Sequence, residues 1–268
     1  MVAHPRPYAV LDDVSRDAGP VRPDRLKRAL DFGIGLGLLI AVLPVILVLW
    51  ALVRVTSSGP GFYSQVRVGR GGRPFWIYKI RTMTFGCEIG SGVKWATKGD
   101  ARVTPVGRVL RRLHLDELPQ LLNVLRGEMS LVGPRPERPE FVVPLSAAVA
   151  GYPERHRVRP GVTGLAQIQL PADTDLASVR RKVVLDRHYV EFGTLWLDLR
   201  IALGTFVYLL GFSYARVRRL LALPNPLSAP ALGLARRSGT HEVLGGAAGH
   251  KPAPLGAESA PPARGAAR

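Results

Sequence analysis

The longest apolar run of the chain predicts a membrane helix near the N-terminus. The 22 residues from Phe32 to Val53 carry no charge, and as a helix they would be about 33 Å long, enough to cross a bilayer. The run begins too late and is too long for a signal peptide, and Arg54 follows it where small residues would mark a cleavage site. The alternative is a buried helix of a soluble domain, for which this length is unusual.

Two features of the run bear on its topology. Pro44 removes one backbone hydrogen bond and clashes with the carbonyl of Ile40, so a kink is expected there. The cations that flank the run are Arg22, Arg25, Lys27, Arg28, Arg54, Arg67, Arg70 and Arg73. Basic flanks favour the cytoplasmic side. A re-entrant helix that bends at Pro44 and returns satisfies both flanks, while a Pro-kinked spanning helix is the competing topology.

The rest of the chain divides by composition. Residues 1–22 are polar and are predicted to form a flexible arm before a membrane helix over 23–55. Residues 56–222 carry the mixed apolar and polar pattern of a folded domain. Residues 223–268 are rich in Pro, Ala and Gly and are predicted to form a disordered tail.

Patterns within the folded domain predict mostly helices. Phe75–Tyr78 is typical of a short strand, and leucines at helical spacing predict a helix over 117–126 that ends at Gly127. A second amphipathic helix is predicted over 175–191. A third stretch, 194–219, has an uncharged part of 15 residues followed by arginines, which fits an interfacial helix or a core helix. The expected fold class is α+β, predominantly helical.

Charge and composition narrow the function classes. Lys and Arg number 37 and Asp and Glu 20, so the net charge is +17. This favours a polyanionic partner, which means nucleic acid, an anionic membrane surface or a phosphorylated substrate. A hydrophobic content of 47% excludes a wholly disordered chain. The single cysteine, Cys87, excludes an internal disulfide framework and a cysteine-based zinc site, and the six histidines show no metal-ligand spacing.

The sharpest polar motif is LDELPQ, from Leu115 to Gln120. Pro119 belongs in the first turn of a helix, so Asp116 is predicted at a helix N-terminus, where the dipole favours an anion. An acidic pair there is often only a cap and a first-turn residue. With many cations nearby, however, the pKa of Asp116 is expected to be lowered and the carboxylate fully ionised.

Several cations could bind phosphate around this motif. They are Lys79, Arg81, Arg111, Arg112, Arg135 and Arg159. Arg135 and Arg159 each precede a proline, which biases them to extended backbone, and guanidinium forks match phosphate oxygens. A carboxylate among them could bind Mg²⁺ carrying phosphates or attack phosphorus itself. The alternative is a set of solvated surface arginines.

These motifs occur in an order that resembles the bacterial sugar transferases, also called monotopic polyprenol-phosphate phosphoglycosyl transferases. The resemblance runs from about Asp24 to Leu210. The matching stretches are KRALD from Lys27, Pro44, QVRVG from Gln65, YKIRTM from Tyr78, DARVT from Asp100, Gly107, LR at Leu110, LDELPQLLNV from Leu115, MSLVGPRP from Met129 and RPGVTGLAQ from Arg159. The chain departs from the pattern at Phe85–Gly99 and in the tail. It is expected to be the minimal catalytic form, without the large N-terminal membrane domain of some relatives.

The resemblance implies a monotopic protein of the inner membrane, with a re-entrant helix broken at Pro44 and a cytoplasmic catalytic domain over 56–222. The family transfers a phosphosugar from a UDP-sugar to polyprenyl (undecaprenyl) phosphate with Mg²⁺ and releases UMP, which begins exopolysaccharide or glycoconjugate synthesis. The implied partners are the UDP-sugar, polyprenyl phosphate and membrane lipid, without nucleic acid. Homo-oligomerisation stays open.

The family motifs also imply roles for individual residues. By the match to the family's Asp-Glu dyad, Asp116 would be the nucleophile that forms a covalent phosphosugar intermediate. Glu117 would assist in metal binding or proton handling, and both are expected at the Mg²⁺ site. The expected phosphate-binding residues are Arg111 and Arg135, with Lys79, Arg81 and Arg159 as weaker matches. Asp186 matches a family position whose role is unassigned, and a structural role is the simplest interpretation.

Two other function classes stay open. A membrane-anchored glycosyltransferase would move the sugar without its phosphate and release UDP instead of UMP. A basic nucleic-acid-binding membrane protein would use the charge of +17 as its electrostatic footprint. The sequence carries no helix-turn-helix, zinc-finger or RNA-binding signature in support of the latter.

Overall fold

The computed structural model describes residues 24–88 and 99–225. The predicted arm and nearly all of the predicted tail lie outside these residues. With η for 3-10 helices, the elements are α2 (Arg25–Thr56), β1 (Phe62–Val68), η2 (Arg70–Gly72), β2 (Pro74–Ile80), α3 (Pro105–Arg112), η3 (Leu115–Gln120), α4 (Leu121–Arg126), β3 (Ser130–Val132), α5 (Pro139–Ala148), η4 (Tyr152–Arg157), β4 (Gly161–Thr163), α6 (Leu176–Phe192), α7 (Leu195–Leu209) and α8 (Tyr214–Leu220). The predominantly helical α+β class is confirmed.

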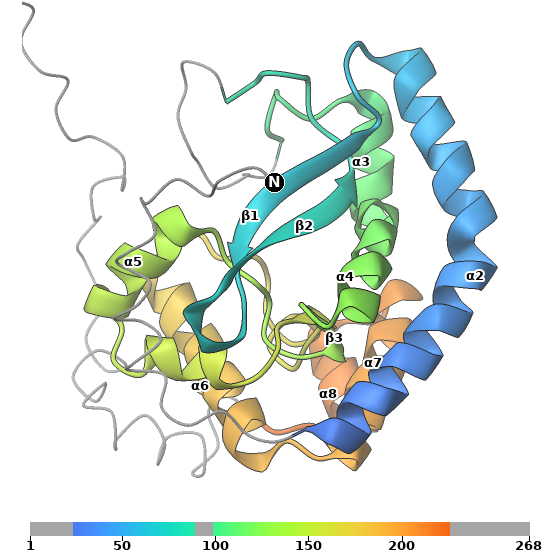
Figure 1. Ribbon diagram of the computed structural model, residues 1–268. Coiled ribbons are helices and arrows are strands. Elements are labelled where there is room, and N and C mark those ends of the chain that lie inside the picture. The colour runs from blue at the N-terminus through green and yellow to red at the C-terminus, as the bar shows by residue number, and fades with distance from the viewer. Residues whose placement is uncertain (1–23, 89–98, 226–268) are drawn as a thin grey trace, which may run out of the picture.

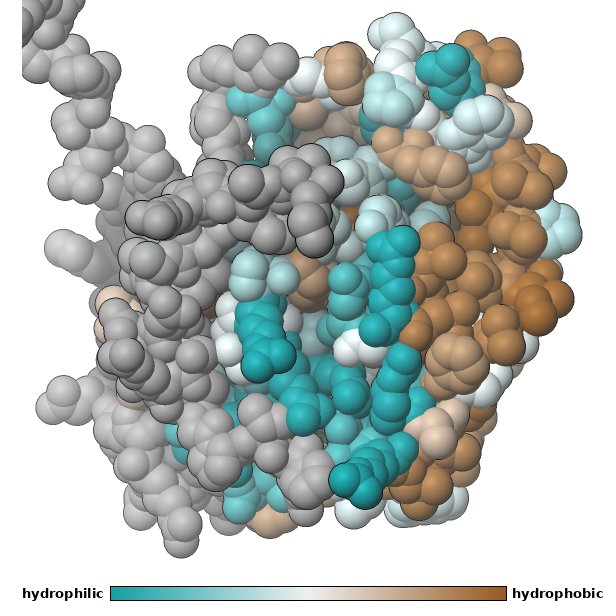
Figure 2. Space-filling view, in the orientation of Figure 1, coloured by the Kyte–Doolittle hydropathy of each residue, from teal (hydrophilic) through white to brown (hydrophobic). Residues whose placement is uncertain are grey.

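The long apolar run forms α2, a helix of 32 residues that is long and apolar enough to cross a membrane. Only 17% of its most apolar stretch is buried, so it is not the core helix of a soluble domain. The helix continues unbroken through Pro44, and Figure 1 shows it curving along one side of the body. Its outer face gives the brown apolar band of Figure 2.

The N-terminal end of α2 is fixed to the body by charged side chains. Arg28 donates to the carbonyls of Val124 and Leu125 at 2.5 and 2.6 Å, in the last turn of α4. Lys27 forms an ion pair with Asp198 of α7 at 2.7 Å. The membrane-capable helix is therefore joined to both α4 and α7.

The strands form two small sheets within the described residues. β1 and β2 make an antiparallel hairpin that pairs Phe62 with Ile80 and Val68 with Pro74, while β3 and β4 pair in parallel. The strand predicted at Phe75–Tyr78 is confirmed as the middle of β2. Figure 1 shows the hairpin lying across the face of the body, beside α3 and α4.

The predicted helices are present, with two changes. The helix over 117–126 is divided into η3 and α4. The stretch 194–219 is divided into α7 and α8, because Gly211 turns the chain with φ +90°. α7 fits both interpretations of the sequence, a core helix and an interfacial helix. Ile201 is buried in the core, while Trp196 and Phe206 are 66% and 63% exposed.

Candidate active site

A cavity of about 850 Å³ opens between the β1–β2 hairpin, η3 and the segment around Arg135. Figure 2 shows hydrophilic side chains gathered at the centre of this face, beside the apolar band of α2. Most of the residues that the sequence proposed for the site line this cavity. They are Lys79, Arg81, Arg111, Asp116, Glu117 and Arg135. The fold thus brings together residues from β2, α3, η3 and the segment Pro134–Arg135–Pro136.

The backbone just before the dyad turns sharply. His114 adopts a left-handed conformation with φ +55°, and its carbonyl accepts a hydrogen bond from the Glu117 N–H at 3.3 Å. Left-handed backbone is uncommon outside glycine. The turn ends α3 and begins η3, and it places Asp116 and Glu117 in the first turn of η3, both buried.

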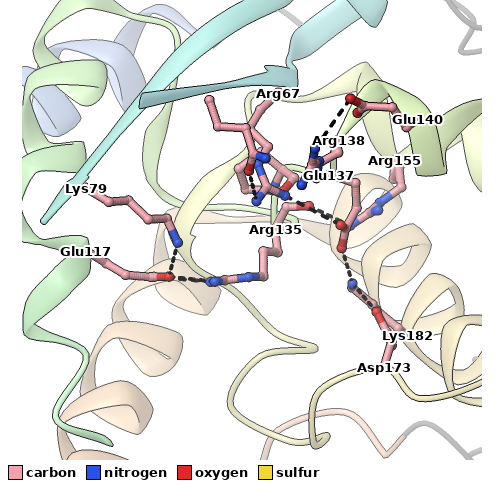
Figure 3. Close-up of polar contacts among 12 residues, drawn as sticks. Arg67, Lys79, Glu117, Arg135, Glu137, Arg138, Glu140, Arg155, Asp173 and Lys182 are labelled. Carbon is pink, nitrogen blue, oxygen red and sulfur yellow. Dashed lines mark hydrogen bonds and ion pairs between the residues drawn. The ribbon is translucent and has the colours of Figure 1, made fainter. Parts of the chain in front are cut away.

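Glu117 is held between two cations. Lys79 Nζ donates to its Oε1 at 2.6 Å, and Arg135 donates to Oε1 and Oε2 at 2.5 and 3.2 Å. Figure 3 shows Glu117 between these two side chains. Burial alone would raise the pKa of Glu117, but Arg135 and Lys79 outweigh it and hold that pKa well below its usual range. Glu117 is therefore an ionised carboxylate with its charge compensated.

The carboxylate of Asp116, unlike that of Glu117, is not paired with a cation in the described part of the chain. Among the described residues, none donates a hydrogen bond to its carboxylate. Burial has the largest effect and raises the pKa of Asp116. The neighbouring Glu117 also raises this pKa, while Lys79, Arg135 and Arg111 lower it. The expectation of a lowered pKa for Asp116 is therefore wrong. The cations nearest the dyad pair with Glu117, and burial decides the direction for Asp116.

The other predicted cations differ in how free their guanidinium groups are. Arg111 lines the cavity and donates to the Thr82 hydroxyl at 2.8 Å. Arg81 also lines it, but its donors hold the turn after α2, at the carbonyls of Pro60 (2.6 Å) and Ser57 (3.1 Å). Arg112 is exposed on α3 and does not line the cavity.

Arg159 is not brought to this cavity. It forms an ion pair with Asp24 at the start of α2 and donates to the Gly127 carbonyl at 3.1 Å. Asp24 also pairs with Arg70 at 2.9 Å. The structure thus places Arg159 at the docking site of α2, because a carboxylate and a helix-terminal carbonyl there satisfy its donors.

Four charged residues of the cavity wall were missed by the sequence prediction. Arg138 pairs with Glu88 at 2.8 Å, and Arg67 lies 3.7 Å from Glu137. Burial would raise the pKa of Glu137, but Lys182, Arg155 and Arg67 outweigh it and lower that pKa to about 2. Arg138 precedes a proline, so the signal that singled out Arg135 and Arg159 could have found it.

Comparisons with known proteins show which family this chain matches. The model of the family described as bacterial sugar transferase matches residues 22–211. A UDP-glucose:undecaprenyl-phosphate glucose-1-phosphate transferase of Caulobacter vibrioides is 46% identical over 202 residues, which cover 73% of this chain and 74% of that protein. Exopolysaccharide production protein PSS of Rhizobium leguminosarum bv. phaseoli is 40% identical over 192 residues, 68% of this chain and 94% of that protein.

A third relative is a longer protein. The UDP-N-acetylgalactosamine-undecaprenyl-phosphate N-acetylgalactosaminephosphotransferase of Aeromonas hydrophila is 44% identical over 162 residues, which cover 60% of this chain but 38% of that protein. With a family match that spans α2, the dyad and α7, the chain belongs to the bacterial sugar transferase family.

Proposed function

We propose that this protein transfers a phosphosugar from a UDP-sugar to undecaprenyl phosphate and releases UMP. The relatives named above support the reaction class, because their names state UDP-sugar donors and an undecaprenyl phosphate acceptor. The cavity supports it independently. Donor and acceptor both carry phosphate, and Lys79, Arg111 and Arg135 supply positive charge to one buried site beside an apolar, membrane-capable helix.

The contrast between the two dyad carboxylates carries the proposal of a covalent mechanism. Asp116 Oδ attacks the phosphorus that bears the sugar. A P–O bond to Asp116 forms, the bond to the bridging oxygen of the diphosphate breaks, and UMP leaves with that electron pair. An oxygen of polyprenyl phosphate then attacks the same phosphorus, which forms the polyprenyl diphosphosugar and restores the Asp116 carboxylate. Glu117 is a weaker candidate nucleophile, since Lys79 and Arg135 already bind its oxygens.

The cations act on both phosphates in turn. Arg111 and Arg135 orient the diphosphate and neutralise the charge that develops on the leaving UMP, which is the main source of rate in phosphoryl transfer. Lys79 and Arg135 also keep the Glu117 carboxylate turned away from phosphorus.

The residues present fit a magnesium ion that is carried by the substrate. In the described parts of the chain, no group of three or more candidate ligands forms a complete metal site, but Mg²⁺ usually binds one or two carboxylates together with phosphates and water. Asp116 would hold it, with Glu117 beside it. When bound, the ion would neutralise charge on the donor diphosphate.

The arrangement of α2 supports a monotopic topology at the cytoplasmic face of the inner membrane. Its N-terminal end is joined to the body through Arg28 and Lys27, and its C-terminal end through Arg81, which donates to the Ser57 carbonyl. One body that lies on one side of the membrane therefore holds both ends of the helix. The exposed Trp196 and other apolar side chains of α7 add a second surface for the lipid interface.

The test combines product identity with mass analysis of the enzyme. Purified protein is incubated with undecaprenyl phosphate and a panel of UDP-sugars, and UMP and UDP are quantified. UMP is expected, whereas UDP would indicate a glycosyltransferase. Without lipid acceptor, intact-mass analysis should show a phosphosugar adduct on the wild type and on the control Glu140→Gln, which changes an exposed carboxylate outside the cavity. Asp116→Asn should show neither adduct nor turnover, and normal turnover in this variant would contradict the covalent mechanism.

A further inference from the structure

A buried ion pair lies behind the cavity, outside the residues that the mechanism uses. Arg155 of η4 and Asp186 of α6 are each only 2% exposed and lie 2.8 Å apart. Arg155 also donates to the Tyr152 hydroxyl at 2.9 Å and to the backbone carbonyl of Arg135 at 2.8 Å. Through Arg155, the pair thus reaches the backbone of Arg135, one of the residues that bind Glu117.

The backbone of residues 134–137, which include Arg135, is held almost wholly through its carbonyl oxygens. Its two prolines have no N–H groups, so the carbonyl oxygens are its main means of attachment. In chain order, the acceptor carbonyls and their donors are Pro134 with the Gly161 N–H (2.9 Å), Arg135 with Arg155 (2.8 Å), Pro136 with Arg67 (3.1 Å) and Glu137 with the Val68 N–H (2.9 Å). Arg155 is the donor that fixes the peptide of Arg135 itself.

Stability alone is a poor explanation for this ion pair. Two charges that are almost fully buried lose most of their hydration, and well-packed apolar side chains of the same volume commonly stabilise a fold as well or better. An apolar pair could fill the same space between η4 and α6, but it could not donate to the Arg135 carbonyl. The planar guanidinium donates to the Tyr152 hydroxyl and to this carbonyl through its two terminal nitrogens, while its charge is paired with Asp186.

We propose that the Arg155–Asp186 pair is a positioning element for the reaction, which fixes Arg135 so that its guanidinium binds Glu117 and leaves Asp116 free to attack. The proposal rests on the proposed function, in which Asp116 is the nucleophile. If the peptide of Arg135 were free to shift, its guanidinium could turn to the neighbouring Asp116, for which none of the described residues provides a hydrogen bond. Asp116 would then be a paired carboxylate and a poorer nucleophile.

The test is a double-mutant cycle between Arg155 and Arg135. Arg155→Lys keeps the charge beside Asp186 but lacks the fork, and it is expected to slow UMP release about tenfold, since small misplacements of catalytic groups have large costs. In an Arg135→Gln background the same change is expected to cost less than about twofold, because the residue through which Arg155 acts is already lost. An equal fold loss in both backgrounds would overturn the proposal.

Two further variants test whether a general loss of structure could explain the result. Asp186→Asn keeps the shape of the partner and leaves Arg155 in place, and it should show the same dependence on Arg135 to a smaller extent. Arg187→Lys is the matched control, since Arg187 and Glu154 form another ion pair between α6 and η4 at 2.8 Å. It should keep wild-type turnover. If this control lost as much activity as Arg155→Lys, any disturbance between the two helices would suffice and the proposal would be wrong.

A binding measurement separates this proposal from the proposed function. UDP affinity is measured by calorimetry for the wild type, both single variants and the double variant of the cycle. If the wild type releases no UMP from any UDP-sugar, the proposed reaction fails, and the cycle is judged on UDP affinity alone. Non-additive losses of affinity would still support the positioning of Arg135 by Arg155, and additive losses would overturn it.

Discussion

At the scale of single residues, Asp116 and Glu117 show how adjacent carboxylates acquire different properties. Both are buried in the same turn of η3, but Lys79 and Arg135 approach only Glu117 within hydrogen-bonding distance. Because burial disfavours charge and close cations restore it, Glu117 is stabilised as an anion and Asp116 is not. Burial of the ionised Asp116 carboxylate therefore opposes folding.

The dyad predicts opposite effects of two conservative substitutions on stability. Since the pKa of Asp116 is raised in the folded state, its ionised form at neutral pH opposes folding, and Asp116→Asn should keep or raise the melting temperature in detergent. Glu117→Gln should lower it, because it leaves the half-buried Lys79 and Arg135 without their counter-charge. Equal melting temperatures for the two variants would contradict these environments.

Glu137 predicts a pH dependence of stability. Its pKa of 4.5 is lowered to about 2 in the fold, and Lys182 binds it at 2.6 Å. A lowered folded-state pKa gives stability that is present above the unfolded value and is lost as the pH falls toward the folded value. This contribution is on the order of 3 kcal/mol and should disappear between about pH 4.5 and about pH 2. Thermal melting of wild type, Glu137→Gln and the exposed control Glu140→Gln measures it.

In that series, wild type and Glu140→Gln should lose melting temperature steeply as the medium is acidified. Glu137→Gln should start lower at neutral pH and fall less over the same interval. Parallel curves for all proteins would show that Glu137 does not contribute through its charge.

The sequence predicted the members of this site better than their pairings. LDELPQ and the arginine–proline dipeptides singled out Asp116, Glu117 and Arg135, because their spacing is local. The sequence could not predict that Arg135 binds Glu117, since these residues are 18 positions apart and only the fold brings them together. The place of Arg159 was missed for the same reason, as its partner Asp24 is 135 residues away.

At the scale of elements, periodicity predicted the long helices and failed for short pieces. α6 spans Leu176–Phe192, close to the expected 175–191, because nine of its residues are buried at regular helical spacing. β3 and β4 have three residues each, too few for an alternating pattern. The break between η3 and α4 follows from Pro119, which has no N–H to bond the Leu115 carbonyl.

The packing of α3 yields a prediction at this scale. A Cβ on Gly107 would lie 2.1 Å from the Thr82 carbonyl oxygen, and backbone cannot move aside as a side chain can. Gly107→Ala should therefore push α3 away from the segment that follows β2, lower the melting temperature and cost about 1–3 kcal/mol. Activity should fall as well, because Arg111 on α3 is oriented by Thr82 at 2.8 Å.

The matched control for Gly107→Ala is Gly37→Ala in α2. Gly37 is also a helical glycine, and a Cβ there would have nothing within 4 Å. Melting temperature and turnover of this variant should stay at wild-type levels or rise slightly, since alanine favours helix. If both substitutions had the same effect, the close approach of α3 to the backbone of Thr82 would not matter for the site.

At the scale of the whole molecule, the surface places an apolar face for the membrane beside a polar face for phosphate groups. The apolar face of α2 forms a band at the edge of a hydrophilic face (Figure 2). The proposed lipid acceptor would need this arrangement, with its tail in the bilayer and its phosphate at the polar site. The net charge of +17 favours anionic lipid surfaces as well as phosphate substrates. Charge alone leaves nucleic acid open as a partner.

The last prediction concerns the orientation of the molecule in the membrane. Because the body holds both ends of α2, exposed sites before and after the helix should lie on the same, cytoplasmic side. Cys87 is first replaced by serine, and single cysteines are introduced at Arg25 and at Ser58, both exposed. A membrane-impermeant maleimide should label both sites in inverted inner-membrane vesicles and neither in intact spheroplasts. Labelling from opposite sides would show a spanning helix. Pro44→Leu should then favour the spanning form, because a helix with a restored hydrogen bond at that position is less able to bend and return.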